Sequence, residues 1–313
     1  MIESAVQASV ASALQSHVVT IDGFHYHYFE QGVGAPLLLL HGFPDHAAAW
    51  RPLFERLPMT LRLLAPDQRG YRQTRRPTST DAYRIDLLVE DLVKLLDWWK
   101  VPQIHICGHD WGGLLGFELA RQAPSRVASI VALNAAPLEI LQRMIWHDPP
   151  QRKASQYITR LRSPDADSVF HESAVETLIE RFLGDARRQG ILTDADISVY
   201  RDAWTQPNAW QSMLAWYRAA PLDVPDISAP APALAEDYDG SRKIEHPVLL
   251  LWGDRDTIFV PRMADAVAAG CRDCRIIRFS NAGHMPHREE PEKCASLIRE
   301  FINSHPIDIA AEN

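Results

Sequence analysis

The sequence predicts an α/β fold in which a mostly parallel, doubly wound β-sheet carries helices on both faces and an inserted helical cap. Three observations support this prediction. Short, continuously apolar runs are typical of strands that are buried on both faces of a parallel sheet. These runs alternate with segments whose apolar residues recur at helical spacing. Between residues 137 and 247 the alternation stops, and the pattern there is helical without a buried-strand run.

The strands can be located one by one from their hydrophobic pattern. The segment Phe24–Gly32 alternates between apolar and polar residues and predicts an edge strand. Continuous apolar runs predict the strands that are buried on both faces. They lie at Pro36–Gly42, Leu61–Asp67, Ile104–Asp110, Val127–Ala135 and Pro247–Asp254, and a further strand is predicted at Arg275–Ser280.

Two amphipathic helices accompany these strands. Apolar residues recur at helical spacing from Ile85 to Trp99 and again from Cys294 to Phe301. The second stripe follows Pro291, and proline is favoured in the first turn of a helix. Helices that alternate with parallel strands cover both faces of the sheet, which predicts the doubly wound arrangement.

The segment without buried strands predicts the cap. It is rich in Trp, Tyr and Arg, and Asn208 with Gln211 resembles a capping box at the start of a helix. A proline-rich stretch then returns the chain to the strand at Pro247. We therefore expect a core domain of residues 1–136 and 245–313 and a cap domain of residues 137–244. The cap would cover the carboxyl edge of the sheet, where ligands bind in open α/β folds.

Composition limits the partners that we expect. The chain has 313 residues, a formal net charge of −8 and an isoelectric point near 5.9. Its Lys and Arg residues are scattered, so a nucleic-acid partner is not expected. The start of the chain has no early Lys or Arg, which argues against a secretory signal, and no run of 18 apolar residues predicts a membrane span. Residues 1–16 suggest no role, and a homodimer is left open.

The four cysteines favour a reduced, cytoplasmic protein. Cys271 and Cys274 form a C-x-x-C pair, which can indicate a redox or metal site. Neither a second pair nor a histidine at ligand spacing accompanies it. We therefore expect neither a metal nor a cofactor.

A glycine-flanked aspartate stands where a strand is predicted to turn into a helix. Gly108 and Gly112 flank Asp110 in the pattern of the G-x-S-x-G nucleophile elbow, with aspartate at the serine position. Asp256 follows a later strand and His284 follows the last one, which gives the order nucleophile, acid, histidine that is typical of α/β-hydrolases. The simpler interpretation makes Asp110 only a helix N-cap.

Five motifs together resemble the epoxide hydrolase branch of the α/β-hydrolases, to which the haloalkane and fluoroacetate dehalogenases are closely related. The motifs are HGFP (His41–Pro44), DQRGY (Asp67–Tyr71), GHDWGG (Gly108–Gly113), WGDRD (Trp252–Asp256) and AGHMPHREEP (Ala282–Pro291). The resemblance extends from about Val18 to Ser304. It implies an α/β-hydrolase fold and a cofactor-free enzyme that adds water to a small, apolar epoxide and yields a vicinal diol.

The chemistry of such a substrate explains the aspartate. An epoxide offers a saturated carbon, and attack by serine would leave an ether, whereas a carboxylate leaves an ester that water can cleave. Asp110 is therefore predicted to be the covalent nucleophile, and His284, oriented by Asp256, the general base. Asp256 matches the family's acid position and is preferred to Asp254. The other acid position known in the family corresponds to Asn134, which is not a carboxylate.

The resemblance also assigns residues around the nucleophile. The oxyanion hole would consist of the backbone N–H groups of Phe43 and Trp111, and the substrate pocket would include Phe43, Trp111 and His109. Tyr157 and Tyr217 match the two cap tyrosines that donate hydrogen bonds to the epoxide oxygen. Tyr217 also fits the packed stripe of a helix, and the two roles do not exclude each other.

A dehalogenase is the alternative, because it would use the same Asp–His–Asp triad. The Trp111 indole could help to bind a departing halide, and a second donor could come from a cap tryptophan. The candidates for that donor are Trp146, Trp204, Trp210 and Trp216. Fluoroacetate dehalogenases carry arginines just after the nucleophile, where this chain has Trp111 and Leu114, and a histidine at the position of Tyr157.

Five other residues can be judged from their positions in the motifs. Arg72, Arg75 and Arg76 were expected to be surface charges that would favour anionic substrates only if they faced the site. His46 and His287 do not stand at catalytic positions of the motifs, so they were expected to be structural or exposed.

Overall fold

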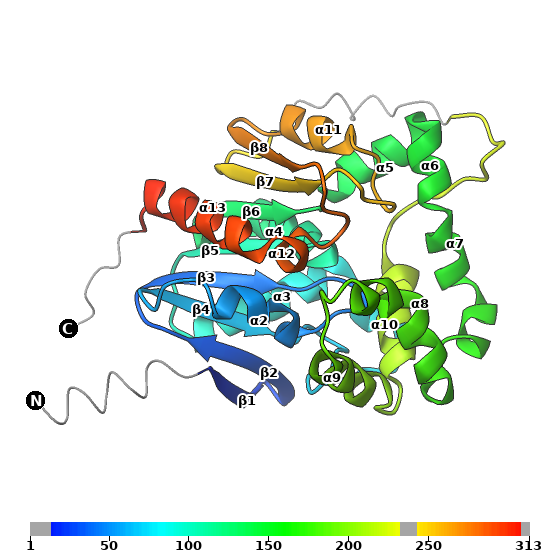
Figure 1. The fold of residues 1–313 in the computed structure, drawn as a ribbon, viewed down its shortest axis with the longest axis horizontal. Coiled ribbons are helices and arrows are strands. Elements are labelled where there is room, and N and C mark those ends of the chain that lie inside the picture. The colour runs from blue at the N-terminus through cyan, green and yellow to red at the C-terminus, as the bar shows by residue number, and fades with distance from the viewer. Residues whose placement is uncertain (1–13, 232–242, 308–313) are drawn as a thin grey trace, which may run out of the picture.

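A single eight-stranded sheet forms the centre of the computed structural model, which describes residues 14–231 and 243–307. The strand order is β1-β2-β4-β3-β5-β6-β7-β8, and the six strands from β4 to β8 in this order run parallel to one another (Figure 1). The strands are β1 (Gln15–Ile21), β2 (Phe24–Gln31), β3 (Ala35–Leu40), β4 (Leu61–Pro66), β5 (Ile104–His109), β6 (Val127–Leu133), β7 (Val248–Gly253) and β8 (Cys274–Phe279). The predicted doubly wound sheet is thereby confirmed.

The antiparallel edge of the sheet differs from the prediction. The expected edge strand, β2, lies between β1 and β4 and pairs antiparallel with both. The outer strand is β1, whose residues alternate in exposure along its length. Its sequence, QSHVVTI, has only a short apolar run, so hydrophobic periodicity did not reveal it.

The helices of the core lie on both faces of the sheet, as alternate strand residues require. Leu38 and Leu40 of β3 pack on the face covered by α3, α4 and α11, whereas Leu37 and Leu39 pack on the face covered by α2 and α13. The core helices are α2 (Arg51–Phe54), α3 (Ile85–Trp98), α4 (Trp111–Gln122), α11 (Met263–Ala269), α12 (Pro286–Glu289) and α13 (Pro291–Ser304).

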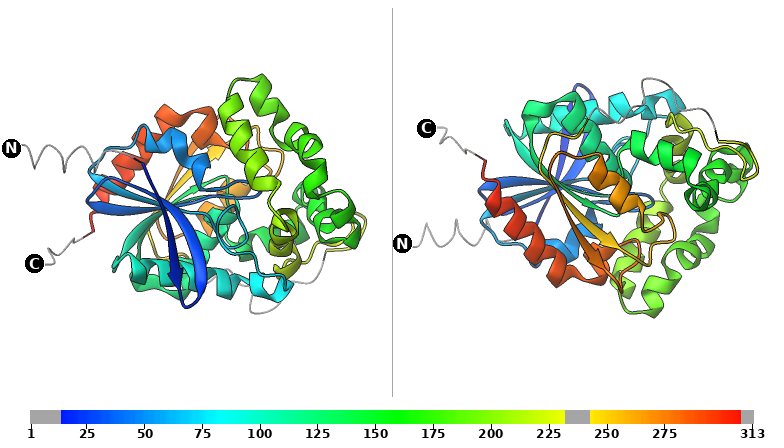
Figure 2. Two further views of the ribbon diagram at one scale, coloured as in Figure 1. Left: turned by 90° about the horizontal axis from the view of Figure 1, so that it is seen from below. Right: turned by 90° about the horizontal axis from the view of Figure 1, so that it is seen from above.

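The cap consists of helices that lie between β6 and β7 in the chain. They gather beyond the carboxyl ends of the parallel strands, as all three views show (Figures 1 and 2). These helices are α5 (Leu138–His147), α6 (Pro149–Ala154), α7 (Gln156–Arg162), α8 (Val175–Arg188), α9 (Asp194–Trp204) and α10 (Ala209–Ala219). The domain boundaries at 136/137 and 244/245 stay a prediction, and residues 232–242 lie outside the described part of the chain.

The capping box predicted at Asn208 is wrong. Asn208 precedes α10 in a left-handed conformation, with φ of 59°, and its side chain makes no capping hydrogen bond. Asparagine adopts this conformation more readily than most residues, so backbone geometry explains it here. A capping box does form at α9, where Thr193 and Asp196 bond each other's backbone N–H groups.

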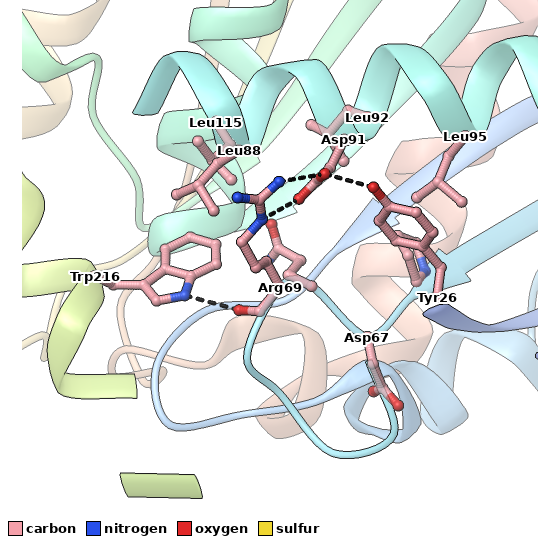
Figure 3. A pocket seen from close by; sticks show the side chains of 11 residues that line it. Tyr26, Asp67, Arg69, Leu88, Asp91, Leu92, Leu95, Leu115 and Trp216 are labelled. Atoms are coloured by element: carbon pink, nitrogen blue, oxygen red, sulfur yellow. Dashed lines mark hydrogen bonds and ion pairs between the residues drawn. The ribbon is translucent and has the colours of Figure 1, made fainter. Parts of the chain in front are cut away.

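Cap tryptophans attach the cap to the core. The Trp216 indole donates to the backbone oxygen of Arg69 at 2.9 Å, and the Trp204 indole donates to that of Pro44 at 3.1 Å. Figure 3 shows that Arg69 is itself held by the Asp91 carboxylate, which also accepts from the Tyr26 hydroxyl at 2.6 Å. The hollow between them measures about 10 Å³, enough for about one water molecule and too small for a substrate.

The model also bears on the other predictions made from the whole chain. No described helix is long and apolar enough to cross a membrane. Cys271 and Cys274 are both free, and Cys271 is buried. The segment 1–13, which includes most of the residues without an assigned role, lies outside the described residues.

Candidate active site

Asp110 lies on a tight turn between β5 and α4. Its φ of 52° and ψ of −121° are unfavourable for a residue with a Cβ. The turn is tight enough to require glycine: a Cβ on Gly112 would lie 2.0 Å from the Leu40 carbonyl oxygen, and one on Gly108 would lie 2.5 Å from that of Gly112. A Cβ on Gly42 would lie 2.5 Å from the Asp110 side chain. The neighbouring glycines therefore allow this conformation and bring the HG loop close to Asp110.

The Asp110 carboxylate faces away from its own helix. It makes no capping hydrogen bond to α4, which argues against a role as a simple N-cap. Its Oδ1 accepts from the Phe43 backbone N–H at 2.9 Å. Trp111 begins α4, so its N–H belongs to the first helical turn, whose donors have no partner within the helix. Both N–H groups therefore border Asp110, and the Phe43 N–H already binds it.

His284 lies between two carboxylates. Its Nδ1 is 2.8 Å from Asp256 Oδ2, and its Nε2 is 3.6 Å from Asp110 Oδ2. Burial alone would lower the pKa of His284, but the charge and hydrogen bonds of the two carboxylates outweigh this and raise it to about 10. The imidazole is therefore protonated at neutral pH while both carboxylates are ionised.

Asp256, in the loop after β7, is held by three donors besides His284. Its Oδ1 accepts from the backbone N–H groups of Ile258 at 2.6 Å and Phe259 at 3.2 Å. Its Oδ2 accepts from the Asn134 side chain at 2.6 Å. Burial opposes ionisation, but His284 and these donors lower the pKa of Asp256. The carboxylate is therefore fixed and charged.

Asn134 is a site residue that the sequence interpretation missed. It stands at the end of β6 with φ of 38°, and its Oδ1 accepts from the Gly253 N–H at 2.7 Å. The sequence did contain an indication that Asn134 lies at the site, because it occupies the family's alternative acid position. Asp254, the rejected candidate for the acid, pairs instead with Arg278 at 2.8 Å.

The two predicted tyrosines lie together above Asp110. Tyr157 of α7 and Tyr217 of α10 have ring centroids 5.9 Å apart, and Tyr217 also contacts the rings of Phe43 and Trp111 at 5.0 and 5.3 Å. Burial is the main reason that the pKa of each phenol is raised, and the charge of Asp110 adds to it. Both hydroxyls therefore stay protonated at neutral pH and can donate hydrogen bonds.

A cavity of about 390 Å³ joins these groups. Such a volume is typical of small-molecule sites. Its wall includes Asp110, His284, Tyr157, Tyr217, Phe43 and His109, together with apolar and aromatic residues of α7 and α8. Trp111 borders a second hollow of about 20 Å³, which Asp110 and both tyrosines also line. The predicted nucleophile, acid, base, tyrosines and oxyanion donors are thus brought together at one place.

A second polar cluster lies directly behind this site. Nitrogen or oxygen atoms of Asp45, His109 and His287 lie within 4.8 Å of one another, and within the described residues this is the one such group that could hold a metal ion. Arg288 binds Asp45 at 3.0 Å and supplies the positive charge that a cation would otherwise bring. His109 Nε2 is 2.8 Å from the His284 backbone oxygen, so His109 fixes the loop of the base besides lining the cavity.

The remaining histidine and arginine predictions have mixed outcomes. His46 and His287 are buried, 2% and 1% exposed, which removes the option of exposed histidines. Arg72, Arg75 and Arg76 do not line the cavity. Arg72 lies 3.8 Å from Asp67, and Arg75 donates to the Gly23 carbonyl oxygen at 3.2 Å.

Comparison with known proteins agrees with this geometry. Residues 35–291 match the family model of the α/β-hydrolase fold. The chain is 27% identical to epoxide hydrolase 2 of Caenorhabditis elegans (91% of this chain, 79% of that protein) and 26% identical to a haloalkane dehalogenase of Mesorhizobium japonicum (94% and 93%).

A solved structure shows the same relationship in three dimensions. The epoxide hydrolase of Bacillus megaterium, in complex with an inhibitor, superposes with a TM-score of 0.82 at 25% identity. The superposition covers 92% of this chain and all of that one, cap included. The chain belongs to the α/β-hydrolase family and is an epoxide-hydrolase-like member of it.

Proposed function

We propose that this protein is an epoxide hydrolase that converts an epoxide to a vicinal diol through an ester on Asp110. The observation that carries the proposal is a carboxylate at the elbow, bound by a backbone N–H and facing a histidine, beneath two protonated tyrosines. A carboxylate nucleophile suits a saturated carbon, and phenol donors suit an oxygen that becomes negatively charged. The relatives named epoxide hydrolase support the same assignment.

In the first step the ring opens. Asp110 Oδ1 is bound by the Phe43 N–H, which leaves Oδ2 free to attack. A bond forms between Oδ2 and a ring carbon, the carbon–oxygen bond of that carbon breaks, and its electron pair goes to the epoxide oxygen. Tyr157 and Tyr217 donate hydrogen bonds to this oxygen and supply its proton. The result is an ester between the substrate and Asp110.

In the second step water cleaves the ester. Alkylation removes the charge of Asp110, so one of the two carboxylates that raise the pKa of His284 no longer acts. The imidazole then gives up its proton, which balances the proton lost by the tyrosines, and becomes a base. Neutral His284 takes a proton from water as the water attacks the Asp110 carbonyl, and the oxyanion forms on Oδ1 at the Phe43 N–H. The intermediate then collapses: the bond between the Asp110 carbonyl carbon and Oδ2 breaks, its electron pair goes to Oδ2, and this oxygen takes the proton from His284 and leaves with the diol. The new carboxylic acid of Asp110 gives its proton to His284, which restores the starting state.

The proposal can be tested by trapping the ester. His284→Gln should form the ester but hydrolyse it slowly, so mass spectrometry after epoxide treatment should find the adduct on the Asp110 peptide. Asp110→Asn in the same background is the matched control and should carry no adduct. If His284→Gln reacts on no residue with any of a panel of aliphatic and aromatic epoxides, the mechanism is wrong.

Dehalogenation is the second candidate, because a haloalkane dehalogenase is among the relatives and Trp111 lies beside Asp110. The cap offers little support for a second halide donor. The indoles of Trp146, Trp204 and Trp216 already donate to Asp223, Pro44 and Arg69. Trp210 has no acceptor for its indole N–H among the described residues, but it does not line the cavity.

One variant separates the two reactions. Tyr217→Phe should slow epoxide opening by about 100-fold, since general acid catalysis contributes 10²–10⁴-fold and Tyr157 remains. Halide displacement needs no proton donor and should change little. Halide release by the wild type that exceeds diol formation would favour the dehalogenase.

A further inference from the structure

The charges on the wall of the cavity are not balanced. Arg160 of α7 and Arg181 of α8 both line it, and both side chains are exposed to solvent, as expected at its mouth. Within the described ranges 14–231 and 243–307, neither arginine has a carboxylate at ion-pair distance. The two carboxylates of the wall do have cationic partners: Asp45 has Arg288 at 3.0 Å, and Asp110 has His284 at 3.6 Å.

Other arginines of the described residues, such as Arg143 and Arg299, also lack an ion-pair partner, but Arg160 and Arg181 are the two arginines that line the cavity. Acidic residues outnumber basic ones by 40 to 32, so carboxylate partners are plentiful. On α8 itself, Arg187 and Arg188 pair with Asp194 and Glu180. Arg181, on the same helix but facing the cavity, does not. Two unpaired positive charges therefore remain at the mouth of a cavity that ends at Asp110.

Arg181 also lies against two aromatic rings. Its guanidinium carbon lies 5.6 Å from the ring centroid of Phe170 and 5.8 Å from that of Phe182, and both rings line the cavity. A guanidinium on aromatic rings is attracted by their faces and keeps its N–H edge free. That edge matches a carboxylate, which it can bind through two parallel hydrogen bonds. The site is thus partly preorganised for an anion.

Much of the remaining wall of the cavity is apolar. Leu161, Leu183, Ile258 and Met285 line it, together with the two phenylalanines. A molecule that fits this wall has a hydrocarbon segment between a reactive centre at Asp110 and an anionic group at the mouth. An uncharged epoxide would leave both guanidinium groups without a partner.

We propose that Arg160 and Arg181 bind the carboxylate of an amphipathic epoxide whose oxirane ring lies at Asp110. This inference rests on the proposed function and changes the expected substrate from a purely apolar epoxide to an epoxy carboxylate. The arginines are specificity residues distant from the reacting atoms. They should therefore stabilise ground state and transition state alike, and their loss should raise KM more than it lowers kcat.

The test compares an epoxy alkanoate with its methyl ester, which has the same chain and no charge. Wild-type kcat/KM should be about tenfold or more higher for the acid, in line with one or two exposed charged hydrogen bonds. Arg181→Gln and Arg160→Gln should each remove most of this preference and change ester hydrolysis by less than about twofold. Arg187→Gln, exposed on the same helix but outside the cavity, is the matched control.

Binding provides a second measurement that does not depend on turnover. A saturated alkanoate of the same length should bind the wild type in titration calorimetry, and Arg181→Gln should weaken that binding about tenfold. Equal kcat/KM for acid and ester, with no effect of either arginine variant on rate or on binding, overturns the inference and leaves the epoxide hydrolase intact. Alkanoate binding that needs the arginines, without epoxide turnover, supports the carboxylate-binding role of the arginines, contradicts the proposed function and overturns the epoxide part of the inference.

Discussion

Two histidines on the wall of the cavity lie side by side and have opposite protonation. His284 and His109 have ring centroids 4.7 Å apart, yet the pKa of His284 is raised to about 10, and that of His109 is lowered to about 4. Burial lowers the pKa of both residues. Of the two, only His284 lies between two carboxylates at ion-pair distance, and these contacts reverse the effect of burial.

The pKa values of the two other histidines of this region are lowered, as that of His109 is. The pKa of His46 is lowered to about 4 by burial, and that of His287 is lowered chiefly by burial and also by the charge of Arg288. These three rings are neutral at the pH at which His284 is charged. A proton therefore stays on one ring of the cluster, which is the ring that faces Asp110. Local pairing, and not residue type or burial, decides which histidine can exchange a proton with the reaction.

The contrast between His284 and the neutral histidines predicts that Asp256→Asn has the largest effect on the rate of hydrolysis. Without this carboxylate, His284 should resemble its neighbours, its pKa should fall and its ring should lose orientation. We expect hydrolysis to slow by about 10³–10⁴-fold, as when the acid of a serine triad is neutralised. Steady-state rates and the histidine signals in NMR titrations measure the two effects. Asp254→Asn removes a carboxylate two residues earlier in the same loop, which pairs with Arg278, and should change neither the rate nor the pKa of His284 much.

Asp110→Asn tests the second carboxylate and imitates the uncharged ester. The variant should be inactive, and the pKa of His284 should fall below its wild-type value of about 10 because only Asp256 remains ionised beside it. An NMR titration of the histidine rings checks this directly. An unchanged His284 pKa would mean that esterification does not release the base, and the proposed second step would have to be abandoned.

His109→Phe tests whether a neutral neighbour contributes through position. The variant keeps a ring but loses the bond between Nε2 and the His284 backbone oxygen. We expect kcat to fall by about tenfold, the effect of roughly one hydrogen bond, with the pKa of His284 still raised. His109→Gln, which offers an N–H donor, should restore part of the rate. A large fall in the His284 pKa would instead make His109 an electrostatic partner.

The residues predicted for the core part of this site lie together in the structure. Strand ends, glycine-flanked turns and the order Asp110, Asp256, His284 depend on local backbone rules, and the structure brings these residues together. Less could be predicted where distant segments meet. The contact of Asn134 with Asp256 joins β6 to the loop after β7, and the burial of His46 and His287 depends on the packing of the cap and α12.

The cap was predicted only as a helical segment. Hydrophobic periodicity indicated its helices, but it could not show which polar residues of those helices face inward. Arg72, Arg75 and Arg76 formed the conspicuous basic run in the sequence, yet Arg160 and Arg181 line the cavity. The strand β1 was missed for another reason, because its exposure alternates while its sequence, QSHVVTI, does not alternate between apolar and polar residues.

The smallest predicted effect is the contribution of His46 to the pH dependence of the free energy of unfolding. Its ring is buried against Tyr200 at 4.5 Å, and neither nitrogen has a hydrogen-bond partner among the described residues. Its pKa is about 4 in the folded protein against 6.5 for the free side chain, so the unfolded chain binds more protons between these values. This residue therefore makes the protein less stable as pH falls from about 6.5 to about 4.

His46→Phe should remove that loss while keeping a ring in place. At pH 7 the free energy of unfolding should change by less than about 1 kcal/mol, and at pH 4.5 the variant should be more stable than the wild type by about 1–2 kcal/mol. Urea denaturation at both pH values measures the difference, with the exposed His147→Phe as control. Equal destabilisation of both variants at the two pH values would show that His46 carries a proton in the folded state, and the contrast with His284 would no longer hold.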